Sequence, residues 1–141
     1  MQENNLSGGI DNLGNLSQLV QIDLSFNRFT GSSPDMFVRL RRLETLKLAP
    51  NGFNSTLPSS LSSCPTLRVV SIRNRSLAGE IGIDFRMLPR LNTFDARTNK
   101  LSGAIPAGLA WRADLRTNLA RNKLEGEIPE SFKNWSSLWY M

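Results

Sequence analysis

The sequence contains no histidine, and among its 141 residues there is one cysteine, Cys64. The absence of histidine excludes Ser-His-Asp and Cys-His catalysis, His-ligated zinc and histidine pH switches. A single cysteine cannot form an intrachain disulfide, and alone it cannot make a thiolate metal site. We therefore assign the chain no catalytic residue, no metal site and no cofactor.

Long hydrophobic runs are also missing. The sequence has no stretch of about 18 apolar residues, so it predicts no transmembrane helix. Residues 1–6 lack the basic and then apolar pattern of a signal peptide. The composition is nevertheless that of a folded protein, with 40% hydrophobic and 21% charged residues. These features leave the localisation of this chain open.

Positive charge exceeds negative charge, with 17 lysines and arginines against 12 acidic residues. A net charge of +5 favours acidic partners. The densest basic run, residues 39–42, has three arginines, which is too short to indicate a nucleic-acid patch. Because the other arginines are scattered and not interleaved with aromatic residues, we expect no nucleic-acid partner.

An internal repeat of 24 residues dominates the chain. Copies begin at Leu19, Leu43, Leu67, Leu91 and Leu115. In most of them positions 1, 4 and 6 are apolar, position 9 is asparagine and position 13 is glycine. Positions 1 to 6 predict a short strand whose apolar side chains face a core and whose alternate residues face outward. Such a repeat predicts a solenoid of stacked coils.

We expect one α/β-type repeat array, a right-handed curved solenoid with a short parallel sheet on its concave face and an irregular or 3-10 outer face. The array is divided into a partial repeat 1–18, repeats 19–42, 43–66, 67–90, 91–114 and 115–137, and a partial repeat 138–141. The strands are expected near Gln21–Leu24, Thr45–Leu48, Val69–Ile72 and Thr93–Ala96.

The position-9 asparagine sits where the chain leaves each strand. Its amide both donates and accepts hydrogen bonds, so it can satisfy backbone groups of neighbouring coils. We expect a ladder formed by Asn4, Asn27, Asn51, Asn99 and Asn122. Positions 19 and 22 bury a further apolar pair in each coil, and Cys64, at position 22, is interpreted as a small core residue.

The last full repeat is irregular. Seven steps separate Leu115 from Asn122, where the preceding repeats have eight. We place the gap between Thr117 and Asn118, which removes the position-4 residue and predicts a short or absent strand near 117–119. Arg112 occupies a core position just before it and should reach outward, because a buried guanidinium needs a partner.

These repeats resemble the leucine-rich repeat of the plant extracellular type, and the chain is similar to the middle of a plant leucine-rich-repeat receptor kinase ectodomain. Residues 12–24, 62–71 and 130–134 most resemble the phytosulfokine receptors. The resemblance implies a non-catalytic recognition module that presents its concave face to a sulfated peptide hormone and to a co-receptor kinase. It also implies a parent protein at the extracellular face of the plasma membrane, whose kinase domain is absent from this chain.

Both ends fall within a repeat and carry no capping segment, so an internal fragment of a larger array, or a truncated product, is expected. Five N-x-S/T sequons suit a secreted parent. These candidate glycosylation sites are Asn5, Asn15, Asn54, Asn74 and Asn134.

Outward positions of the strands give the candidate ligand-binding residues. They are Asp23, Ser25, Lys47, Ser71, Arg73, Thr93, Asp95 and Arg97. Lys47, Arg73 and Arg97 lie on successive coils about 5 Å apart, where they could hold a sulfate or carboxylate. The alternative is a set of solvated Lys/Arg–Asp pairs, each of little energetic value. Two further roles stay open: an inhibitor or decoy that binds another protein, and a degenerate remnant without activity.

Overall fold

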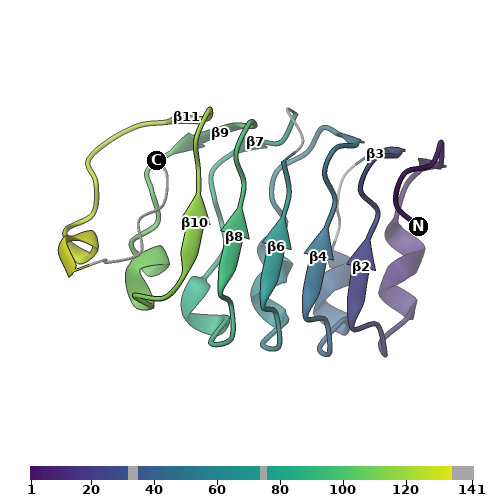
Figure 1. Cartoon of the computed structure of the whole chain (residues 1–141), viewed down its shortest axis with the longest axis horizontal. Coiled ribbons are helices and arrows are strands. Elements are labelled where there is room, and N and C mark those ends of the chain that lie inside the picture. The colour runs from purple at the N-terminus through teal and green to yellow at the C-terminus, as the bar shows by residue number, and fades with distance from the viewer. Residues whose placement is uncertain (32–34, 74–75, 135–141) are drawn as a thin grey trace.

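The computed structural model describes residues 1–31, 35–73 and 76–134. Five parallel strands, one from each coil, form a sheet in the order β10-β8-β6-β4-β2 along the solenoid (Figure 1). They are β2 (Gln21–Asp23), β4 (Thr45–Lys47), β6 (Val69–Ser71), β8 (Thr93–Asp95) and β10 (Arg116–Asn118). The predicted solenoid is confirmed, and its first four strands begin at the predicted residues and end one residue earlier.

Two smaller parallel sheets, ordered β1-β3-β5 and β11-β9-β7, lie along the upper edge in Figure 1. Their strands are β1 (Ser7–Gly8), β3 (Arg28–Gly31), β5 (Gly52–Phe53), β7 (Ala78–Gly79), β9 (Lys100–Gly103) and β11 (Lys123–Leu124).

The outer face consists of short 3-10 helices, as predicted; in Figure 1 those of the middle coils lie behind the five-stranded sheet, and the yellow one lies beyond β10. They are η1 (Asp11–Asn15), η2 (Asp35–Arg39), η3 (Ser59–Ser63), η4 (Phe85–Met87), η5 (Ala107–Trp111) and η6 (Glu130–Asn134). Within the described ranges, no helix has the length and apolar character needed to cross a membrane.

The core fills the space between the five-stranded sheet and the 3-10 helices. The central residues of three neighbouring strands, Leu46, Val70 and Phe94, are at most 1% exposed. The Phe94 ring meets Phe85 of η4 edge to face, with 5.0 Å between ring centroids. Cys64 is fully buried, and burial raises the pKa of its thiol to about 11. The thiol is therefore protonated at neutral pH, as suits a core side chain.

The position-9 asparagines join successive coils. Asn99 is 7% exposed, and its amide nitrogen donates to Ile72 O at 3.0 Å and to Ala96 O at 2.9 Å. Its Oδ1 accepts from the backbone N–H of Leu77 at 3.2 Å. The bonds of Asn51 and Asn122 follow the same pattern, whereas exposed Asn4 donates to the nearby Gln2 O. Each interior asparagine thus satisfies backbone groups of two coils.

The prediction for the last full coil is wrong in two respects. β10 is as long as the other strands of its sheet, and it pairs in register with β8: Thr117 lies opposite Phe94, and Asn118 opposite Asp95. The missing residue therefore lies between Leu115 and Arg116, ahead of the strand. Thr117 fills position 4 and is 6% exposed.

The backbone hydrogen bonds show the same displacement. In the coil before, the N–H groups of Asn92 and Thr93 both donate to Arg68 O, whereas at the start of β10 Arg116 N–H donates to Asn92 O. The chain accommodates the deletion in the approach to the strand, where one residue fewer leaves the inward and outward alternation intact.

Arg112 reaches outward, as predicted. Its side chain is 32% exposed and its Nε donates to Asp114 Oδ1 at 2.8 Å. Another guanidinium nitrogen donates to Pro89 O of the preceding coil. The hydrogen bonds from Arg112 hold the pKa of the Asp114 carboxyl below its usual value. A polar contact between coils thus replaces the leucine or cysteine packing found at position 22 elsewhere.

Candidate ligand-binding face

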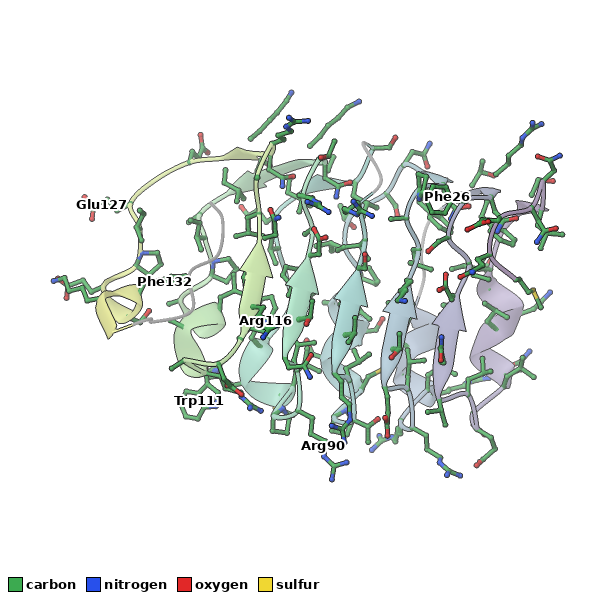
Figure 2. The ribbon with its side chains drawn as sticks, in the orientation of Figure 1. Phe26, Arg90, Trp111, Arg116, Glu127 and Phe132 are labelled. Atoms are coloured by element: carbon green, nitrogen blue, oxygen red, sulfur yellow. The ribbon has the colours of Figure 1, made fainter. Side chains whose placement is uncertain are left out.

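The solvent side of the five-stranded sheet, here called the sheet face, carries two rows of outward side chains. Strand register places Gln21, Thr45, Val69, Thr93 and Arg116 in the first row. The second row, two residues further along each strand, consists of Asp23, Lys47, Ser71, Asp95 and Asn118. Arg116, labelled in Figure 2, projects from the front of β10.

The N-terminal part of the sheet face is a self-contained cluster. Lys47 Nζ lies 3.8 Å from Asp23 Oδ2, and Ser25 N–H donates to Asp23 Oδ1 at 3.1 Å. Burial raises the pKa of Asp23, but hydrogen bonds from Ser25 and the charge of Lys47 outweigh it, so the pKa lies below its ordinary value. Ser25 itself is only 9% exposed. Asp23 thus contacts both of the other predicted site residues, Lys47 and Ser25, and Ser25 has little surface to offer a ligand.

The C-terminal part of the sheet face gathers two arginines around one carboxylate. The Nε atoms of Arg73 and Arg97 lie 3.7 and 3.4 Å from Asp95 Oδ2. Arg97 Nε is buried and makes no hydrogen bond among the described residues, so the side-chain contact with Asp95 is an ion pair, while the backbone N–H of Arg97 donates to Asp95 Oδ1 at 3.3 Å. Two positive charges thus share a single negative charge and leave a local positive excess.

Lys47 does not belong to this arginine group. Lys47 lies opposite Ser71 of β6, and Ser71 lies opposite Asp95 of β8, so these three residues share the second row. Arg73 and Arg97 each lie two residues further along the chain than the second-row residue of their own coil. The structure therefore separates the three predicted cations into one lysine paired with Asp23 and two arginines around Asp95. Ser71 and Thr93 are half-buried between these groups.

Hollows in the surface connect the arginines with neighbours that the sequence analysis did not select. The first, here called the basic hollow, has a volume of about 400 Å³ and is lined by Arg73, Arg97, Thr98, Asn118, Ala120 and Arg121. The second, here called the apolar hollow, has a volume of about 230 Å³ and is lined by Phe26, Ala49, Pro50, Arg73 and Thr98. The two hollows share Arg73 and Thr98, so they adjoin.

Three of the unselected residues share a position that could have revealed them. Phe26, Thr98 and Arg121 each precede a ladder asparagine, and each has a left-handed backbone, with φ of 56°, 58° and 59°. This conformation turns the chain out of the strand at the edge of the sheet face, where Phe26 and Arg121 are exposed and Thr98 is half-buried; Figure 2 shows Phe26 there. Their place directly before a ladder asparagine is the sequence feature by which these residues could have been predicted to line the edge of the sheet face.

A further hollow, of about 680 Å³, lies on the outer face between η4 and η5. The charged groups in its wall, Asp84 and Arg86, are already paired, with Arg86 Nε 3.0 Å from Asp84 Oδ1. The hydrogen bonds from Arg86 hold the pKa of Asp84 below its usual value. Because this pair satisfies itself, the outer hollow offers less charge to a ligand than the basic hollow does.

In the part of the chain that the structure describes, no group of three or more acidic or cysteine side chains is placed to hold a metal ion. Three of the five sequon asparagines, Asn5, Asn15 and Asn54, are exposed. Asn134 ends η6, and Asn74 lies outside the described residues.

Comparison with known proteins places this geometry in context. The Leucine Rich Repeat family model matches residues 18–40 and 116–135. Receptor-like protein 35 of Arabidopsis thaliana is 33% identical over 140 residues, which are 99% of this chain and 14% of that protein. The chain spans 9% to 16% of the length of the curated relatives it matches.

Solved structures agree with the sequence matches. The plant peptide hormone receptor RGFR1, in complex with RGF2, superposes with a TM-score of 0.89 and 36% identity, covering 97% of this chain and 22% of that one. The Arabidopsis receptor kinase HAESA, in complex with the peptide hormone IDA and the co-receptor SERK1, gives a TM-score of 0.89 and 30% identity over 97% of this chain and 24% of that one. The chain is therefore a leucine-rich-repeat protein, homologous to plant receptor-like proteins and to the ectodomains of leucine-rich-repeat receptors.

Proposed function

We propose that this chain is a non-catalytic recognition module that binds an acidic peptide on its sheet face. The observation that carries the proposal is the pair Arg73 and Arg97, which share the single carboxylate of Asp95 in the wall of the basic hollow. Arg121 adds a third guanidinium to the same wall. An anionic group of a peptide would form charge-assisted hydrogen bonds with these arginines.

The homologues support the same class of partner. RGFR1 and HAESA are structures of plant receptors bound to peptide hormones, and HAESA also carries the co-receptor SERK1. By analogy, the chain would act within a receptor ectodomain at the outer face of the plasma membrane, where a co-receptor kinase joins the ligand-bound face. The finer resemblance to phytosulfokine receptors makes a tyrosine-sulfated peptide the first ligand to test.

The intact register of β10 favours this role over a degenerate remnant. The deleted residue falls outside the strand, so the sheet face continues without a break from β2 to β10. Asn118 of β10 lines the basic hollow, which therefore depends on the last full coil.

Titration calorimetry with a tyrosine-sulfated pentapeptide and its unsulfated twin tests the proposal. We expect weak binding, because an open hollow offers few enclosed contacts, and a preference of roughly tenfold for the sulfated form. The preference should shrink as salt rises, since exposed charges are screened beyond about 8 Å at physiological ionic strength.

Replacing Arg73 and Arg97 together with alanine should abolish the preference. Arg68→Ala is the matched control, because Arg68 lies in the same coil and forms an ion pair with Glu44 at 3.3 Å but lines neither hollow. Equal binding of the two peptides, or an unchanged preference in the double variant, would refute the proposal and leave an inactive remnant as the better interpretation.

A further inference from the structure

The edge of the sheet face changes chemistry along the solenoid. Side chains at position 8, just before each ladder asparagine, are Phe26 and Pro50 in the first two full coils, and Thr98 and Arg121 in the last two. One residue earlier, at position 7, Ala49 is followed by Arg73 and Arg97. One end of this edge is therefore apolar and the other is cationic.

The apolar end exposes an aromatic ring that the core does not use. Phe26 is 53% exposed, although the core residues on either side of it in the sequence, Leu24 and Phe29, are 4% and 8% exposed. The left-handed backbone of Phe26 is shared by Thr98 and Arg121, so the turn explains the conformation but not the choice of an aromatic residue. Non-glycine residues pay a steric penalty in this region, and asparagine is the residue that tolerates it best.

We infer that the two hollows form one bipartite site, which takes a peptide with an aromatic side chain and an acidic side chain about three residues apart. The aromatic side chain would pack on Phe26, Ala49 and Pro50 in the apolar hollow. The acidic side chain would lie among Arg73, Arg97 and Arg121 in the basic hollow. This inference rests on the proposed binding of acidic peptides and adds the residue that such a peptide must carry beside its acid.

The spacing follows from the solenoid. The apolar hollow is centred one and a half to two coils from the basic hollow, because it reaches from Phe26 to Thr98 and the basic hollow from Arg73 to Arg121. Coils stacked about 5 Å apart separate the two centres by about 8–10 Å. An extended peptide advances about 3.1–3.3 Å per residue, so a separation of about three residues spans this distance. Arg73, which lines both hollows, would flank the peptide between its two side chains.

The experiment compares two nine-residue Gly/Ser peptides that each carry a pair of glutamates. One has phenylalanine three residues from the glutamates, and the other has alanine there. Fluorescence anisotropy on the full chain should show the phenylalanine peptide binding roughly tenfold tighter, as expected for partial burial of an aromatic side chain. A third peptide, with phenylalanine directly beside the glutamates, should lose most of this gain.

Phe26→Asn should erase the advantage of phenylalanine over alanine while leaving the glutamate-dependent affinity in place. Asparagine suits the left-handed backbone, so the variant should keep its thermal midpoint. Val20→Asn is the matched control, since Val20 is 43% exposed in the same coil and lines neither hollow. Arg97→Ala with Arg121→Ala should instead remove the glutamate-dependent part for both peptides.

The possible failures can be told apart. If both glutamate peptides bind but Phe26→Asn leaves their ratio unchanged, or Val20→Asn lowers it equally, the bipartite site is wrong and the proposed function stands. If neither peptide binds the unmodified chain at any accessible concentration, the bipartite site and acidic-peptide recognition both fall.

Discussion

The coil that begins at Leu91 and the coil that begins at Leu115 have the same register but differently filled cores. In the first, Phe94 is fully buried and its ring meets Phe85. In the second, the residue in register with it is Thr117, whose hydroxyl has no hydrogen-bond partner among the described residues. One coil is stabilised by aromatic packing, and the other keeps its strand despite a polar atom in the core.

This difference shows that register in the solenoid does not depend on each coil's own core. β10 takes its register from the hydrogen bonds to β8 and from Asn122, whose amide bonds both Ala96 O and Leu119 O. A coil with a weaker core therefore inherits its geometry from the preceding coil, as expected where stability combines the stability of each repeat with that of the interfaces between neighbours.

Removing the stronger core should give the largest effect. We expect Phe94→Ala to lower the free energy of unfolding by about 3–5 kcal/mol, because it leaves a cavity and removes the contact with Phe85. Chemical denaturation measures the change. Thr117→Ala, at the same position of the next coil, should cost clearly less, and equal losses would contradict the contrast between the two coils.

The ladder should follow in magnitude. Asn99→Ala should cost about 2–3 kcal/mol, because it leaves buried carbonyls of two coils and the N–H of Leu77 without their partner. Asn4→Ala is the comparison, since exposed Asn4 donates to Gln2 O. We expect its unfolding midpoint in urea to stay near that of the unmodified chain. A comparable loss at both positions would show that the bonds between coils are not what stabilises them.

Insertions should locate the deleted residue. A leucine inserted between Thr117 and Asn118 should lower stability by about 2 kcal/mol, because it reverses the outward and inward sides of the second half of β10. An asparagine inserted between Leu115 and Arg116 should be tolerated, since the preceding coil has Asn92 at that point. Thermal unfolding of the two variants compares them directly, and the opposite ranking would restore the placement of the gap inside the strand.

The apolar periodicity is sufficient to predict the strands and the core, because Leu46, Val70 and Phe94 can be buried only in one register. The same periodicity misplaces the deletion, because Thr117 counts as a polar residue and so does not match the apolar position 4. Its branched side chain nevertheless has nearly the shape of valine and fits that position. Nothing in the spacing of the leucines separates a gap before the strand from one inside it. That choice is made by hydrogen bonds to the neighbouring coil.

The candidate site is less predictable for a similar reason. Alternation identifies the outward residues. The long side chain of Arg73, however, reaches Asp95 on the next strand, so ion pairs do not form only between residues that lie opposite each other in one row. The direction of Phe26 and Arg121 depends on a left-handed backbone that their residue types do not favour. It follows instead from the turn at position 8, where Thr98 has the same left-handed backbone.

Repairing the weaker core should produce a smaller change of opposite sign. Thr117→Val replaces an unpaired buried hydroxyl with a methyl group of nearly the same volume. We expect a gain of about 1 kcal/mol, which raises the thermal midpoint by roughly 3–5 °C. Thr117→Ser keeps the hydroxyl and loses the methyl group, so calorimetry should show it to be less stable than the unmodified chain. A loss on Thr117→Val would mean that the hydroxyl has a bound water as its partner.

The smallest expected effect distinguishes the first full coil from the last by pH. In both coils a side-chain oxygen accepts the backbone N–H two residues on: Ser25 N–H binds Asp23 Oδ1, and Ala120 N–H binds Asn118 Oδ1. The carboxylate titrates and the amide does not. Because the folded-state pKa of Asp23 lies below its unfolded value, its contribution to stability is complete above about pH 4 and is lost as pH falls through the folded pKa.

Asp23→Asn should therefore weaken the acid dependence of the unfolding free energy below pH 4, by about 0.5 kcal/mol, since the partner Lys47 is partly exposed and screened by solvent. Asp11→Asn, in the exposed first turn of η1, is the control with the same change of charge, and an identical acid limb in the two variants would show that the Ser25 contact does not set the pKa of Asp23.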